Sequence, residues 1–213
     1  MRIYLQAVFV LGGILALSTT ARADDWGNYS DFSFGIGYGH IELGSSGNEF
    51  HNMDALRMEG AVTFSPFEKL SQLRLGGAFG VSMVLDNSSH AIISNNGTLI
   101  VHASADIPFL LLEPEFRVSW RQEFESGFFI EPGIGLGGAI GQLHLESDSN
   151  GSSYEEWDAN FAARAYLNVG FLVPGGIFGV QASYMHSGSL HFAQNVGGEI
   201  NEFYIGVFGS LMF

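Results

Sequence analysis

Residues 32–39 read Phe-Ser-Phe-Gly-Ile-Gly-Tyr-Gly, so every second side chain is large and apolar. Side chains along a β-strand point alternately to its two faces, and this rhythm therefore gives one apolar face and one face of serine and glycine. The same rhythm recurs in seven later segments, which are residues 56–64, 73–83, 113–121, 130–140, 160–169, 178–184 and 203–213. Eight amphipathic strands therefore account for the chain after its N-terminal region, and an all-β fold is predicted.

The connections between these segments alternate in length. The long ones are residues 41–54, 86–106, 145–158 and 188–200, and the short ones are residues 66–72, 122–127 and 173–176. Long outer loops and short periplasmic turns are typical of barrels that cross an outer membrane. We therefore predict an eight-stranded antiparallel transmembrane β-barrel, and a soluble periplasmic β-sandwich is the alternative that would also alternate.

The N-terminal region has the pattern of a cleavable export signal. Arg2 gives a positive start, Tyr4–Leu17 is apolar, and Ala21-Arg22-Ala23 supplies a small-x-small cleavage site. We expect residues 1–23 to be the signal peptide and residues 24–213 to be the barrel. The formal net charge is −14, and loss of the two arginines in the signal gives −14 − 2 = −16 for the mature chain.

Composition excludes several classes of function. The chain contains no cysteine, so it has no disulfide, no thiolate metal site and no lipoprotein anchor. Its strong acidity argues against direct binding of nucleic acid. The last residue is Phe213, in phase with the apolar face, and a terminal aromatic resembles the signal that the barrel-assembly machinery reads. The expected location is the outer membrane of a Gram-negative-type bacterium.

The polar faces of the strands carry the charges that a narrow lumen would enclose. An eight-stranded barrel has an interior just wide enough to be filled by side chains. The predicted lumen residues are Arg57, Glu59, Arg74, Glu113, Glu115, Arg117, Arg121, Glu131 and Arg164. Opposite charges can pair there, whereas either charge alone would be costly. We interpret this set as a salt-bridged plug, with an ion path as the alternative.

The outer loops are acidic and contain no lysine or arginine under this topology. The third loop is the richest in acids, with Asp148, Glu155 and Glu156 among them. Carboxylates of this kind bind calcium, and a divalent cation would also bridge them to anionic lipid phosphates. A calcium-loop register starting at Glu146, however, puts Trp157 where a bidentate glutamate is required. Solvated loops with no bound cofactor are therefore expected, and a divalent cation at these loops is the alternative.

Two segments resemble a family of outer-membrane enzymes. They are Phe129-Ile130-Glu131-Pro132-Gly133-Ile134-Gly135-Leu136 and Gly179-Val180-Gln181-Ala182-Ser183-Tyr184-Met185-His186, and Asn195-Val196-Gly197-Gly198-Glu199 adds to them. They are similar to the lipid A 3-O-deacylase family, an eight-stranded barrel with a Ser/His/Glu triad on its lipid-facing surface. The resemblance implies His186 as general base, Glu199 as its orienting partner, and an acyl ester of lipid A as substrate.

The nucleophile of that family is out of register here. The family has its serine two residues after the histidine, and this position is Gly188. Ser187 and Ser189 flank it, but ideal alternation turns both inward. A bulge at Gly188 would be needed to bring either serine outward.

The favoured hypothesis is a non-catalytic small barrel, similar to OmpA-type membrane domains and opacity-type proteins. Its acidic extracellular loops would serve surface interaction or envelope integrity. The alternatives are a lipid A ester hydrolase and a narrow porin. The sequence leaves the oligomeric state open.

Overall fold

The structure, a computed structural model, describes most of the chain after the predicted signal peptide. The described residues are 30–44, 53–67, 70–84, 91–94, 97–100, 109–146, 153–192 and 196–212. The predicted signal peptide and Phe213 lie outside these ranges. Among the residues that the structure describes, no helix has the length and apolar character needed to cross a membrane.

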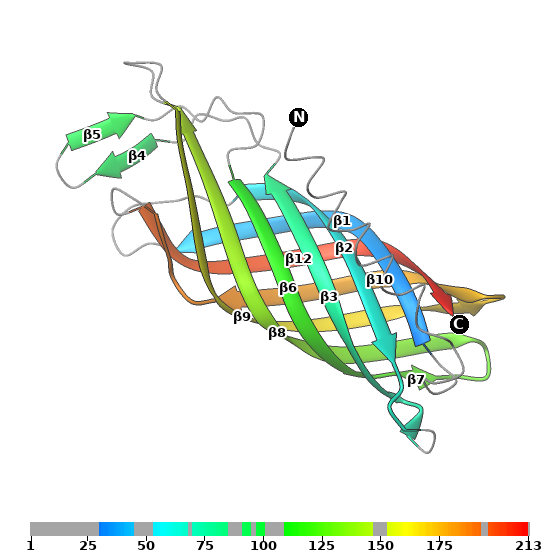
Figure 1. Ribbon diagram of the computed structural model, residues 1–213. Helices are drawn as coiled ribbons and strands as arrows, with labels where there is room; N and C mark the ends of the chain where they lie inside the picture. Colours follow the sequence, from blue (N-terminus) through cyan, green and yellow to red (C-terminus); the bar gives the residue numbers. More distant parts are fainter. Residues whose placement is uncertain are drawn as a thin grey trace.

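Eight long antiparallel strands close into a barrel, as the alternation predicted (Figure 1). In order around the barrel they are β1 (Ser30–Gly44), β2 (Met53–Phe64), β3 (Leu73–Val84), β6 (Phe109–Trp120), β8 (Phe128–Glu146), β9 (Ser153–Val173), β10 (Gly176–Ser187) and β12 (Val196–Met212). Pairing of β1 with β12, from Asp31↔Met212 to Gly44↔Glu199, closes the sheet. Closure satisfies the backbone groups that an open edge would expose to lipid.

Four shorter strands supplement the barrel. The short strand β7 (Gln122–Glu123) pairs with β8, and β11 (Leu190–Phe192) pairs with β12. A separate hairpin consists of β4 (Ala91–Ser94) and β5 (Gly97–Ile100). Short turns connect β2 to β3, β6 to β8 and β9 to β10 at one end of the barrel, which we call the turn end; the other end is the loop end. Gly127 and Gly175, both in these turns, adopt φ angles of 79° and 80°. Glycine is needed at both positions because this left-handed region strains other residues.

The outer wall of the barrel is apolar. Exposed large side chains on it include Phe34, Ile36, Phe116, Ile134, Leu136, Phe161, Phe178, Val180, Ile205 and Leu211. Their alternate neighbours on the same strands point inward, as the two-residue rhythm predicted. A continuous apolar exterior on a closed sheet is stable only in lipid, so the barrel spans a membrane.

The lumen is filled by large side chains that lie over glycines of the neighbouring strand. A Cβ atom added to Gly133 would lie 2.3 Å from Cζ of Tyr166, and one added to Gly179 would lie 2.9 Å from Cε1 of Phe208. Only glycine leaves room for these rings, so the glycine-rich strands and the inward aromatics are one packing solution.

Each end of the lumen contains a cluster of apolar side chains. The sequence analysis predicted a polar inner face and did not predict these clusters. At the loop end a buried cluster includes Ile41, Leu43, Met53, Phe109, Leu111, Leu143, Leu190 and Ile200. At the turn end Phe129, Ile177 and Phe208 form a second cluster. Charged residues lie between these two apolar clusters, and some also lie at the level of the turn-end cluster, where the Arg121 guanidinium is 5.2 Å from the ring centroid of Phe129.

The strands are longer than the sequence predicted, and the outer loops correspondingly shorter. The expected loop 145–158 is wrong: β8 and β9 pair up to Glu146↔Ser153, which puts Glu155 and Glu156 on a strand. The expected loops 41–54 and 188–200 also lose residues to strands, and the expected loop 86–106 contains the β4–β5 hairpin. The outward apolar residues stop before the strands do, because a backbone ladder needs no lipid to continue.

Arginine on the outer wall tests whether this surface lies in lipid. The Ile134→Arg substitution should destabilise the barrel by about 2–4 kcal/mol, the range for a cation near the bilayer midplane. Urea unfolding from lipid vesicles measures the loss. The control is Ser126→Arg in an exposed turn, which should change stability little. Equal losses in both variants would contradict a hydrocarbon environment around residue 134.

Candidate functional site

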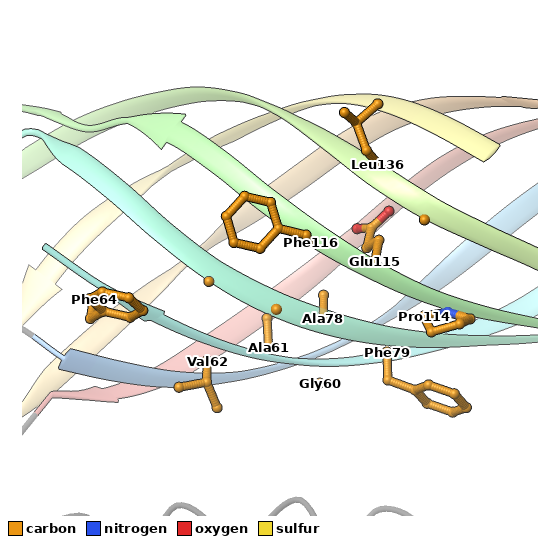
Figure 2. A pocket seen from close by; sticks show the side chains of 13 residues that line it. Gly60, Ala61, Val62, Phe64, Ala78, Phe79, Pro114, Glu115, Phe116 and Leu136 are labelled. Carbon is orange, nitrogen blue, oxygen red and sulfur yellow. The ribbon is translucent and has the colours of Figure 1, made fainter. Parts of the chain in front are cut away.

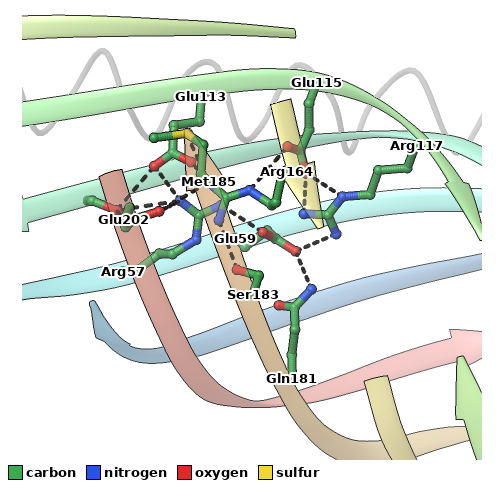
Figure 3. Close-up of polar contacts among 11 residues, drawn as sticks. Arg57, Glu59, Glu113, Glu115, Arg117, Arg164, Gln181, Ser183, Met185 and Glu202 are labelled. Carbon is green, nitrogen blue, oxygen red and sulfur yellow. Dashed lines mark hydrogen bonds and ion pairs between the residues drawn. The ribbon is translucent and has the colours of Figure 1, made fainter. Parts of the chain in front are cut away.

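Three arginines and four glutamates meet in the middle of the lumen, and we call this set the central ring (Figure 3). Its members are Arg57, Glu59, Glu113, Glu115, Arg117, Arg164 and Glu202. They come from β2, β6, β9 and β12, which are alternate strands around the barrel. Inward side chains of alternate strands reach the same height in a staggered barrel, so the topology itself gathers these charges.

Arg57 is the most enclosed member of the central ring, with 0% of its side chain exposed. Its Nη2 donates to Oε2 of Glu59 at 2.8 Å, and its Nη1 donates to Oε2 of Glu202 at 3.1 Å. The same Nη1 also donates to Glu113. The guanidinium lies 5.3 Å from the ring centroid of Tyr204, an arrangement that favours a buried cation.

The other two arginines complete the central ring. Arg164 donates from Nη2 to Oε2 of Glu202 at 3.0 Å and from Nε to Oε2 of Glu115 at 3.2 Å, and it also pairs with Glu113. Arg117 donates from Nη1 to Oε1 of Glu59 at 2.6 Å and also pairs with Glu115. Every glutamate therefore contacts two arginines, and any two arginines share at least one glutamate. The ring has four carboxylates for three guanidinium groups.

A second charge cluster lies nearer the turn end. Arg121 donates from Nε to Oε2 of Glu131 at 2.6 Å and lies 3.0 Å from Oδ2 of Asp31, which Arg74 also contacts. The hydroxyl groups of Thr63 and Ser119 donate to Asp31 and Glu131 at 2.6 and 2.7 Å. Asp31, Arg74 and Glu131 come from β1, β3 and β8, three of the four barrel strands that the central ring leaves out.

The nine lumen residues predicted from the sequence all lie in these two clusters. The structure adds Asp31 and Glu202, which the sequence reading missed. Both were detectable, because Asp31 is in phase with Gly35 and Gly37, and Glu202 is in phase with Tyr204. Buried ion pairs of this kind fix the arrangement of the lumen more than they add to stability.

His186 points to the outer surface, as its phase predicted, but the other proposed triad residues do not gather around it. Its Nδ1 lies 2.9 Å from Oδ1 of Asn201, which also accepts a hydrogen bond from the Tyr184 hydroxyl at 2.8 Å. Asn201 thus takes the partner position that the family resemblance gave to Glu199. Glu199 lies two residues further along β12, exposed and opposite Gly44.

A bulge near Gly188, the feature that would be needed to bring a serine outward, exists, but it does not turn Ser187 outward. Pairing with β12 changes from His186↔Asn201 to Leu190↔Gly198, so one extra residue is accommodated between the two. Ser187 is 0% exposed, and its hydroxyl donates to the carbonyl of Gly188 at 2.9 Å. Ser189 is half-buried, and its carbonyl accepts from Asn160.

A second histidine site on the outer surface was missed by the sequence reading. His40 Nδ1 lies 3.1 Å from Oδ1 of Asp54, and the hydroxyl of Tyr38 also donates to this carboxylate. The arrangement repeats that of Tyr184 and His186 two strands away. Tyrosine and histidine at this level are typical of the interface between lipid and water.

Several acidic residues near the loop end have protein partners. Oε1 of Glu155 accepts from Gln142 at 2.6 Å and from Trp157 at 3.1 Å, and Asp158 accepts from the backbone of His191 at 2.6 Å. Within the described ranges, no three His, Asp or Glu side chains group as metal ligands. Asp148 lies outside those ranges, so the predicted cation site remains a proposal.

Removing one arginine tests the central ring. The Arg57→Met variant should lose about 3–5 kcal/mol of unfolding free energy, because three buried glutamates lose the cation that they share. Urea unfolding measures this loss. The Arg57→Met/Glu202→Met double variant should recover part of it, since one uncompensated carboxylate is removed. A loss below about 1 kcal/mol in the single variant, the range for exposed pairs, would contradict the inference.

The comparisons with known proteins place the chain by fold alone. No protein-family model matches the chain. No curated protein sequence matches it either. Among solved structures, Neisserial surface protein A (NspA) aligns with 10% identity and a TM-score of 0.57 over 87% of this chain and 97% of that one. Ail, the attachment invasion locus protein of Yersinia pestis, aligns with 13% identity and a TM-score of 0.51 over 85% and 99%. By its fold and its apolar outer wall, the chain is one of the small eight-stranded outer-membrane β-barrels.

Proposed function

We propose that this chain is a non-catalytic barrel whose acidic outer end mediates surface interaction or supports envelope integrity. The observation that carries the proposal is a separation of charge. All five arginines in the described ranges are buried in the lumen and paired with carboxylates. Carboxylates at the loop end, by contrast, include exposed side chains such as Glu42, Asp54, Glu155 and Glu199.

An acidic end of this kind selects partners by charge. Exposed carboxylates on β1, β2, β9 and β12 attract cationic segments of a protein partner and raise the rate of encounter. They repel the phosphates of lipid A unless divalent cations bridge the two. A divalent cation held at the outer loops therefore remains part of this proposal, with lipid A phosphates as the opposite ligands.

The filled lumen argues against transport as the main role. Two apolar clusters enclose the central ring, and rings such as those of Tyr166 and Phe208 occupy the space left by glycines. An ion would have to displace paired charges and cross apolar layers at both ends. We therefore favour a function at the surface over the narrow porin.

A cationic probe tests the proposal in the intact barrel. Barrels in phosphatidylcholine nanodiscs should bind an oligolysine peptide with an affinity that falls as salt rises. Glu42→Gln/Glu199→Gln should weaken binding by about twofold to thirtyfold, because exposed ion pairs contribute about 0.2–1 kcal/mol each. The matched control is Glu123→Gln/Glu125→Gln, which removes two exposed carboxylates from the turn end. Equal loss in both double variants, or binding insensitive to salt, would contradict the proposal.

The alternative is a lipid A ester hydrolase, and the outward position of His186 is the observation that favours it. The ring donates one hydrogen bond from Nδ1 to Oδ1 of Asn201, so it is oriented at the outer surface. The Ser187 hydroxyl, however, is buried on the opposite face of the sheet. Since neither Ser187 nor Ser189 makes a described hydrogen bond to the ring, acyl transfer lacks a positioned serine nucleophile, and we rank this function second.

Direct assay with lipid A separates the two functions. Incubation of the detergent-solubilised barrel with lipid A should release no acyl chain detectable by mass spectrometry. If an ester-linked chain is released and His186→Ala abolishes the release while preserving the fold, the hydrolase assignment is correct and ours is wrong. Ser187→Ala and Ser189→Ala would then identify the nucleophile.

A further inference from the structure

A groove crosses the lipid-facing wall over β2, β3, β6 and β8 (Figure 2). Its volume is about 610 Å³. Phe64, Phe79, Phe116 and Leu136 rise around it, whereas Gly60 and Gly77 form its floor. Cross-strand pairing explains this shape, because Gly60 lies opposite Phe79 and Gly77 lies opposite Phe116. A large ring therefore stands beside a position that has no side chain.

The packing of the barrel does not require glycine at position 77 in the floor of this groove. A Cβ atom on Gly77 would meet only the carbonyl oxygen of Glu115, at an ordinary contact distance of 3.7 Å. The adjacent Gly76, which points inward, differs: its Cβ would lie 2.0 Å from the carbonyl oxygen of Val62. The close approach of β2 therefore requires glycine at position 76, whereas glycine at position 77 only leaves the outer wall open.

The chemistry of the groove is that of hydrocarbon. Its raised side chains are aromatic or aliphatic, and the one carboxylate among its lining residues, that of Glu115, turns into the lumen to pair with Arg117 and Arg164 (Figures 2 and 3). The backbone polar groups of the floor belong to the strand ladder. A ligand would therefore gain dispersion contacts and no polar ones.

The position of the groove along the strands indicates in which leaflet of the membrane the groove lies. Phe64 is the last residue of β2, beside the short turn, and Gly77 is four residues after the start of β3 at Leu73. The groove thus runs from the turn end to about the middle of the barrel. Short turns are periplasmic in outer-membrane barrels, so this half of the wall lies in the periplasmic leaflet. That leaflet contains glycerophospholipid, and lipid A belongs to the opposite one.

We propose that this groove binds one acyl chain of a periplasmic-leaflet glycerophospholipid. This acyl chain fills the groove over Gly60 and Gly77 and packs against the rings of Phe79 and Phe116. Because lipid surrounds this wall, acyl chains are the most concentrated ligand next to the groove. This site is separate from the acidic outer end and does not depend on the function proposed for it.

Native mass spectrometry of the intact barrel tests the site. Wild-type barrel, exposed to phosphatidylethanolamine and released from mild detergent, should retain one phospholipid. Gly77→Leu fills the groove and should reduce retention at least about tenfold, since each buried methylene contributes roughly a factor of four in affinity. The matched control is Gly209→Leu, at an outward glycine on β12, a strand that does not line the groove, whose added Cβ meets nothing closer than 3.9 Å. It should retain phospholipid as the wild type does.

Three results would overturn the inference. Equal retention by wild type and Gly77→Leu would mean that the groove is not the site. Preferential retention of purified lipid A in a parallel sample, lost in Gly77→Leu, would assign the groove to the other leaflet's lipid. A dimer that disappears in Gly77→Leu alone would assign it to a second copy of the chain. A folding check by heat-dependent gel mobility keeps each result interpretable.

Discussion

The rest of this structure depends on the mutual neutralisation of arginine and glutamate inside a closed sheet. Arg57, Arg117 and Arg164 are linked to one another through shared glutamates, so none of them can leave without uncovering a buried charge. Because these residues come from alternate strands, the central ring joins β2, β6, β9 and β12 across the lumen. The cluster around Asp31 and Arg121 involves β1, β3 and β8 in the same way. Ion pairs across the lumen thus connect strands that the backbone hydrogen bonds between neighbouring strands do not connect directly.

Two-residue alternation, together with connections that alternate between long and short, predicted the barrel, and the alternation also predicted most of its lumen. It works because lipid outside and a narrow lumen inside impose opposite polarity on neighbouring side chains. It missed Asp31 and Glu202 because both precede the clearly amphipathic part of their strands. It also could not decide the surroundings of His186, since the bulge after this residue depends on how β10 and β11 pair with β12.

The apolar loop-end cluster has a physical cause that the sequence does contain. On β1 the apolar residues are outward at Phe34, Ile36 and Tyr38, but inward at Ile41 and Leu43. Below this point lipid surrounds the wall, whereas above it water does, so apolar side chains gain by turning into the lumen. The reversal of phase marks where the strand leaves the membrane. Tyr38, His40, Tyr184 and His186 lie at this level, which agrees with an interfacial position.

The long β8–β9 hairpin holds the charged residues at its end away from the lipid phosphates. Gln142 is the first polar outward residue of β8, and the strand continues for four residues to Glu146. At about 3.3 Å per residue this adds about 13 Å along the strand, more than the Debye length of about 8 Å at physiological ionic strength. Counter-ions therefore screen the hairpin's end from lipid phosphates, and an acidic protein can coexist with an anionic membrane surface.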